Sequence, residues 1–70
     1  MEPREQFAQN LKTRRLHLGL SQEALGLACG LHRTEISLLE RAARDPRLTT
    51  IVRLARALKI KPAELLNRIQ

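Results

Sequence analysis

Few residues of this sequence could carry out acid–base, nucleophilic or metal chemistry. The 70-residue chain contains 2 histidines and 1 cysteine. His17, His32 and Cys29 lack the clustered spacing of zinc ligands, and Asp45 is the only aspartate. No nucleophile stands in a pattern with a base, and no glycine-rich phosphate loop occurs. The sequence therefore predicts a protein that is not an enzyme and that uses no metal or other cofactor.

The chemistry that the sequence does offer is that of cationic side chains. Lys and Arg number 13 against 7 Asp and Glu, which gives a formal net charge of +6. A charge of this sign favours a polyanionic partner, usually nucleic acid or a membrane surface. Phe7, the sole aromatic residue, cannot form the stacking platform of a single-strand binder. Most of the surplus charge lies in residues 47–70, so composition alone does not locate a nucleic-acid contact.

The most specific pattern is QEALGLACGLHRTEISLLE, which runs from Gln22 to Glu40. Two helices that cross steeply through a short turn need a small residue where they touch and a turn residue that tolerates positive φ. Gly26 and Gly30 stand at these two positions, and a glycine inside a helix, which costs ~1 kcal/mol relative to alanine, requires such a packing reason. The pattern predicts a helix-turn-helix in residues 21–42, with an ordinary helical hairpin as the alternative. Its core-facing positions hold Leu25, Cys29, Leu31, Ile36 and Leu39.

The elements that position this motif are expected to be helices throughout, because β-branched residues are few and no alternating run is long. Glycine and proline divide the chain into five segments. We expect one all-α domain over residues 1–70, without a linker. No apolar stretch is long enough to span a membrane, the polar N-terminus is not a signal peptide, and a lone cysteine suits the reducing cytoplasm. The expected helices are residues 3–18, 21–29, 33 to 42 or 43, 48–58 and 61–69.

Nearly the whole chain resembles the lambda-repressor-like, or XRE/Cro, family of helix-turn-helix proteins. The resemblance is carried by three stretches, RRLHLGLSQEALG, CGLHRTEISLLERAARDP and LTTIVRLARALKIKPAELL. HRTEIS followed by LERAAR resembles more narrowly the controller proteins of restriction–modification systems. The resemblance implies a compact five-helix domain whose third helix enters the major groove. The sequence departs from the family at Arg14, a position that is often apolar, and at three helix caps, where Ser or Asp is usual. These caps are His32, Arg47 and Lys61.

The register of the motif selects the residues that are expected to contact bases. Arg33 and Thr34 fall in the first exposed turn of the third helix, the part nearest the base edges. Arginine can donate two hydrogen bonds to guanine, and threonine can bond a base or touch a thymine methyl group. Ser37 and Leu38 follow one turn later, where Leu38 either meets a thymine methyl group or is an ordinary exposed leucine. Arg44, just past this helix, could also reach a base edge.

Phosphate contacts are expected from Gln22, Arg41 and Arg47. Gln22 matches a phosphate-binding position of the family at a helix N-terminus, where backbone amides and the helix dipole favour an anion. The alternative for the arginines is a solvated basic loop. Glu35 could accept a hydrogen bond from cytosine, but we expect it to cap its own helix. The resemblance also places Arg15 and Glu40 as a structural ion pair between the first and third helices.

The C-terminal helices are expected to carry the dimer interface, within residues 48–70. Val52 falls about 100° away from Ile51 around its helix and outside the centre of the core-facing stripe. Ile60 and Ile69 have no evident place in so small a core, whereas Leu65 is expected to point inward together with Leu66. A two-fold partner would cover Val52, Ile60 and Ile69, and a frayed C-terminus is the alternative. The stripe that should face the core consists of Ile51, Leu54, Ala55 and Leu58.

These expectations combine into one functional hypothesis. The chain is predicted to be a cytoplasmic, sequence-specific regulator of transcription that binds a symmetric double-stranded DNA operator as a homodimer, without a small-molecule ligand. The resemblance narrows this hypothesis to the controller of a restriction–modification system. The alternative is an antitoxin-type interaction module that also autoregulates its operon. That alternative requires exposed apolar area outside the dimer surface.

Overall fold

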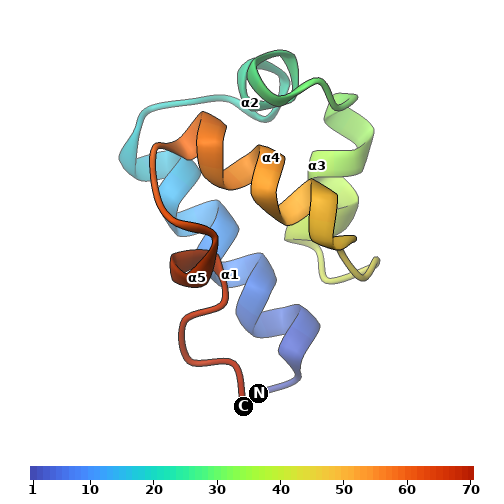
Figure 1. Ribbon diagram of the computed structural model, residues 1–70. Helices are drawn as coiled ribbons and strands as arrows, with labels where there is room; N and C mark the ends of the chain where they lie inside the picture. Colours follow the sequence, from blue (N-terminus) through green and yellow to red (C-terminus); the bar gives the residue numbers. More distant parts are fainter.

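The computed structural model describes residues 1–70 and contains five helices and no strand (Figure 1). The predicted all-α class is therefore confirmed. α2 and α3 pack against each other, α1 packs against α3 and α5, and α4 packs against α2 and α5. In the view of Figure 1 both chain ends lie at the same end of the molecule. The helices are α1 (Pro3–His17), α2 (Gln22–Cys29), α3 (Arg33–Glu40), α4 (Leu48–Leu58) and α5 (Pro62–Leu65).

All five helices contribute to a single apolar core. Leu11 of α1, Leu25 of α2 and Leu65 of α5 are fully buried within it. The predicted stripe of α4 faces this core, and Leu31, which was expected inside, is half-buried at its rim. No helix is both long and apolar enough to cross a bilayer. The core residues are Phe7, Leu11, Leu25, Cys29, Ile36, Leu39, Ile51, Leu54, Ala55, Leu58 and Leu65.

The unusual cap residues do not prevent the helices from starting where the sequence predicts. His32 replaces the usual hydroxyl or carboxylate, because its Nδ1 accepts a hydrogen bond from the Thr34 backbone N–H at 3.0 Å. At α5 the Glu64 carboxylate accepts a hydrogen bond from the Lys61 backbone N–H at 2.8 Å, which satisfies a free donor of the first turn.

Two helices end earlier than predicted. α3 stops at Glu40 because Ala42 adopts a left-handed φ of 57° and the Ala43 N–H bonds back to the Leu38 carbonyl at 2.9 Å, which closes the helix as a Schellman motif does. A glycine normally marks such a stop, and none stands here. α5 stops at Leu65 instead of continuing to Ile69.

The early end of α5 follows from a contact with α1. The Asn10 Nδ2 group donates hydrogen bonds to the carbonyls of Leu65 at 2.9 Å and Asn67 at 2.8 Å. These carbonyls belong to the end of α5 and the turn after it, so α1 holds the C-terminal segment in place. The turned segment exposes 41% of Leu66, so the expectation that Leu66 points inward is wrong.

Arg14, the polar departure in α1, binds a helix end. Its Nε donates a hydrogen bond to the carbonyl of Leu58, the last residue of α4, at 3.0 Å. Helix C-termini carry unpaired carbonyls and partial negative charge, which a guanidinium satisfies. α1 therefore contacts the end of α4 through a polar bond at this position.

Candidate nucleic-acid interface

The turn between α2 and α3 depends on both glycines that the sequence analysis selected. A Cβ atom added at Gly26 would lie 2.5 Å from the Leu31 backbone oxygen, a distance at which the backbone must move. Gly30 adopts a φ of 75° as the C-cap of α2, and the Leu31 N–H bonds to the Gly26 carbonyl at 2.9 Å. The backbone of the turn therefore lies directly on α2, which fixes the position of α3.

The first turn of α3 is presented to solvent by residues buried behind it. Ile36 and Leu39 are fully buried, whereas Arg33 and Thr34 are exposed. Neither the Arg33 nor the Thr34 side chain makes a hydrogen bond or an ion pair within the protein. All donors of the Arg33 guanidinium are therefore available to an external acceptor.

The following turn of α3 is less open. Ser37 and Leu38 are half-buried, and the Ser37 hydroxyl accepts a hydrogen bond from Arg41 Nε at 3.3 Å. Arg41 and Arg47 are both exposed, and Arg47 occupies the N-cap position of α4 without a side-chain cap bond. Their guanidinium groups therefore lie on the surface that adjoins α3.

Glu35 does not cap its own helix as expected. Its Oε1 accepts a hydrogen bond from Arg44 Nη1 at 2.6 Å, within an ion pair, while His32 provides the cap. Arg44 lies in the loop between α3 and α4, so this pair brings the loop back to the first turn of α3. No sequence pattern predicts this pair, because the two residues are nine positions apart across an irregular segment.

Arg15 and Glu40 form the structural ion pair that the family resemblance implies. Arg15 Nε lies 2.6 Å from Glu40 Oε2 and Nη2 lies 2.9 Å from Oε1, with only 8% and 3% of the two side chains exposed. Arg15 Nη1 also donates to the Leu20 carbonyl at 2.7 Å. The hydrogen bond to Glu40 raises the pKa of Arg15, against the opposing effect of burial.

The same carboxylate orients Gln22. Gln22 Nε2 donates to Glu40 Oε1 at 3.2 Å, which uses one of the two amide hydrogens. Gln22 is the first residue of α2, so the remaining hydrogen lies at a helix N-terminus. Glu40 therefore couples the ion pair to the position expected to contact phosphate.

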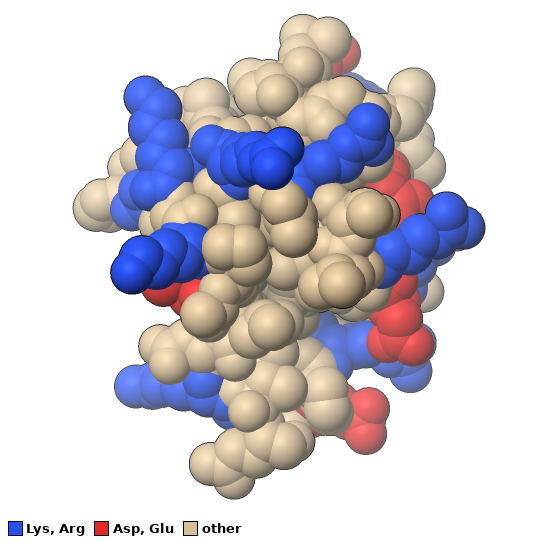
Figure 2. Space-filling model, in the orientation of Figure 1, with Lys and Arg blue, Asp and Glu red and all other residues tan.

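The side chains expected at a dimer interface are only partly exposed to solvent. Ile60 and Ile69 are half-buried and pack against the core, so the expectation that they have no place in it is wrong. Val52 is half-buried as well. Leu48, which was not among the expected interface residues, is 74% exposed, and its position four residues before Val52 puts both on one face of α4. In Figure 2 the middle of the visible face is uncharged, and basic and acidic side chains lie around it.

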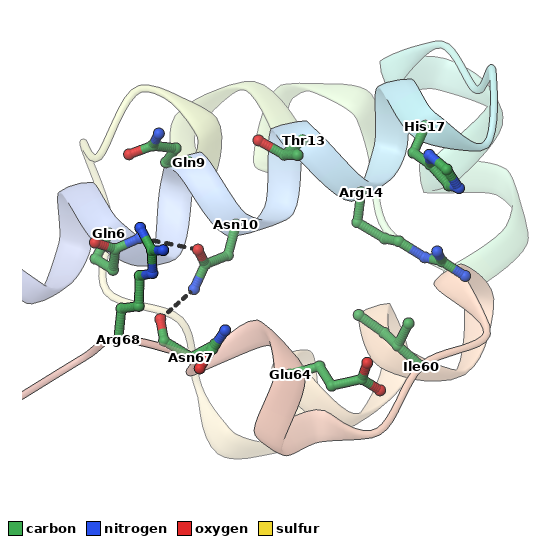
Figure 3. A pocket seen from close by; sticks show the side chains of 10 residues that line it. All are labelled: Gln6, Gln9, Asn10, Thr13, Arg14, His17, Ile60, Glu64, Asn67 and Arg68. Atoms are coloured by element: carbon green, nitrogen blue, oxygen red, sulfur yellow. Dashed lines mark hydrogen bonds between the residues drawn. The ribbon is translucent and has the colours of Figure 1, made fainter.

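A polar groove that the sequence did not predict lies between α1 and the C-terminal segment (Figure 3). It has a volume of about 500 Å³. Gln6 Nε2 donates to Asn10 Oδ1 at 2.9 Å, and the Asn10 amide reaches across to the segment after α5 (Figure 3). No group of three or more His, Cys, Asp or Glu residues that could hold a metal ion occurs. The hydrogen bonds of Asn10 make this groove the boundary along which α1 contacts the C-terminal segment.

Comparisons with known proteins agree with this geometry. The control protein C.SmaI of Serratia marcescens is 41% identical over 68 residues, which cover 97% of this chain and 81% of that protein. The crystal structure of the restriction-modification controller protein C.AhdI from Aeromonas hydrophila is 42% identical with a TM-score of 0.87, over 89% of this chain and 94% of that chain. The P22 c2 repressor protein in complex with synthetic operator 9T is 31% identical with a TM-score of 0.81, over 87% of this chain and 92% of that one. A family model described as helix-turn-helix matches residues 11–65, and the chain therefore belongs to the helix-turn-helix family.

Proposed function

We propose that the chain is a sequence-specific regulator of transcription that binds a symmetric double-stranded DNA operator and controls a restriction–modification system. The observation that carries the proposal is the first turn of α3. Arg33 and Thr34 are exposed and unpaired there, on a helix fixed by a tight glycine turn. The similarity to C.SmaI and C.AhdI supports the controller role.

In this proposal the residues divide into two kinds of contact. Arg33 and Thr34 are the main contacts to base edges, because they stand at the N-terminal end of the helix that enters the major groove. The phosphate contacts fix the register and carry no sequence information themselves. Further base contacts are assigned to Ser37, Leu38 and Arg44, and phosphate contacts to Gln22, Arg41 and Arg47.

The active form is proposed to be a homodimer formed through residues 48–70. The exposed leucines Leu48 and Leu66, at 74% and 41%, support this assignment. Val52 shares a helix face with Leu48, and Ile60 and Ile69 keep part of their surface exposed. A two-fold axis through this region would place two α3 helices about one DNA turn apart, ~34 Å.

Binding to a selected operator tests the proposal. Sites selected from random duplexes and scrambled duplexes would be titrated at two salt concentrations. We expect preference for the selected site and weaker binding at higher salt, because phosphate neutralisation releases counterions. Arg33→Ala should lose ~1–3 kcal/mol of discrimination at particular base pairs, whereas Gln22→Ala should weaken binding to all sequences more evenly. Equal affinity of the unaltered chain for both duplexes would refute the proposed function.

The dimer is tested separately by its oligomeric state. Val52→Asp puts a charge into the proposed interface and should give a folded monomer with weaker operator binding. Leu16→Asp is the matched control, since Leu16 is a 58% exposed leucine on α1, outside residues 48–70. Sedimentation at micromolar concentration distinguishes the outcomes, and a Val52→Asp variant that remains a dimer would place the interface elsewhere.

A further inference from the structure

The ion pair between Glu35 and Arg44 lies within the proposed reading surface. Arg44 Nη1 is 2.6 Å from Glu35 Oε1, and the two side chains are 53% and 24% exposed. Glu35 is the third residue of α3, directly after Arg33 and Thr34. The Arg44 guanidinium therefore lies beside the turn that presents the two exposed, unpaired side chains.

The backbone after α3 makes this contact reachable. The left-handed Ala42 closes the helix, and Arg44 follows two residues later. Glu35 and Arg44 then line the same hollow, of about 510 Å³, together with Arg47 and Arg53. Glu35 is the only carboxylate other than Asp45 among the ten residues that line this hollow. The hollow therefore holds three arginines, of which Arg44 contacts Glu35.

We infer that Glu35 is a positioning residue for Arg44, which it holds at the first turn of α3 so that the arginine reads the operator together with Arg33. The bond to Glu35 uses one of five guanidinium N–H groups and leaves the others for a base or a phosphate. An arginine already held in place loses less side-chain freedom on binding than one on an unrestrained loop. The inference rests on the proposed function, because it concerns how the same surface discriminates between sequences.

The pair also neutralises a carboxylate that would otherwise face the DNA. Without Arg44, the Glu35 charge would repel phosphates, as a like charge does across any interface. Loss of Glu35 should therefore have different consequences when Arg44 is present and when Arg44 is replaced. With Arg44 present, it lowers discrimination, and with Arg44 absent, it restores affinity. An exposed ion pair contributes little to folding, so a purely structural role predicts neither effect.

The test is a double-mutant cycle of Glu35→Gln and Arg44→Ala, read as the ratio of affinities for a selected and a scrambled duplex. We expect Glu35→Gln to lower this ratio roughly two- to tenfold, the range given by one side chain losing its fixed position. In the Arg44→Ala background it should leave the ratio unchanged and raise the affinity for both duplexes. Glu35→Asp, whose carboxylate is one methylene shorter, should lower the ratio without raising affinity for the scrambled duplex.

Glu23→Gln is the matched control, because Glu23 is exposed in the first turn of α2 and forms no ion pair. Removing its charge should raise affinity for both duplexes and leave the ratio unchanged. Thermal unfolding of each variant checks that the fold is retained. A Glu35→Gln ratio equal to that of the unaltered chain, or the same change in both backgrounds, would overturn the inference while the proposed function stands. An unaltered chain that does not discriminate overturns both.

Discussion

Breaking the Arg15–Glu40 pair should remove a large part of the domain's stability. The two side chains are 8% and 3% exposed, so the partner that remains would be a buried charge without compensation. Such a loss costs ~3–5 kcal/mol, while a domain of this size is stable by about 4–10 kcal/mol in total. We therefore expect Glu40→Leu to lower the melting temperature by at least about 12 °C. Operator binding should fall with it, because Glu40 also holds Gln22.

The assay is urea and thermal unfolding followed by circular dichroism on four proteins: the unaltered chain, Arg15→Met, Glu40→Leu and the double variant. The double variant should regain most of the stability, because neither charge is left buried. The cycle measures the coupling between the two residues directly. If Glu40→Leu costs less than about 1 kcal/mol, as for an exposed pair, or if the two single costs simply add, the reasoning is wrong.

Three further predictions concern the turn, the thiol and the chain ends. Gly26→Ala should lower the urea midpoint of unfolding, because its Cβ would meet the Leu31 oxygen at 2.5 Å. The overpacking cost of ~1–3 kcal/mol outweighs the gain in helix propensity. An unchanged midpoint would contradict the close packing. Burial raises the pKa of Cys29, and the thiolate is the form that reacts. A maleimide should therefore label Cys29 only in denaturant. Rapid labelling of the native protein would show an open core. Asn10→Ala removes both hydrogen bonds to the C-terminal segment, worth about 1–3 kcal/mol together, as well as the one from Gln6. It should speed hydrogen exchange and proteolysis after α5; unchanged protection would mean that apolar packing alone holds that segment.

The parts of the fold that follow from local rules were predictable from the sequence. Gly26 and Gly30 identified the turn because a close backbone approach and a positive φ each require a residue without a side chain. The stripe of α4 was predictable as well, since apolar residues at helical spacing face a core. Residues 33 and 34 were placed correctly at the exposed turn because Ile36 and Leu39 fix the rotation of α3.

The ends of α3 and α5 were not predictable, because no glycine marks the stop after α3 and a contact distant in sequence binds the end of α5. Ala42 takes a conformation that an alanine adopts only when the surrounding structure requires it. Asn10 binds carbonyls at the end of α5 and in the turn after it, where a local reading would continue the helix.

The pairing of Glu35 with Arg44 could not be predicted from the sequence either. Glu35 stood where an acidic residue favours its own helix N-terminus, and His32 stood at a cap where Ser or Asp is usual in the family. In the structure the His32 ring caps α3 by accepting a hydrogen bond from the Thr34 N–H. The Glu35 carboxylate forms an ion pair with Arg44 instead. Only the path of the loop after α3 decides between the two arrangements, and no local pattern encodes that path.

The bond between Asn10 and the segment after α5 also bears on the order in which the domain assembles during synthesis. Its donor and acceptors are separated by 55 and 57 positions, so the bond cannot form until residue 67 has left the ribosome. Leu65, which is fully buried, reaches the core equally late. α2 and α3, by contrast, are joined by a short turn and can pair early, since loop closure costs less entropy over short separations. A nascent chain should therefore carry a paired helix-turn-helix before α1 and the segment after α5 are joined.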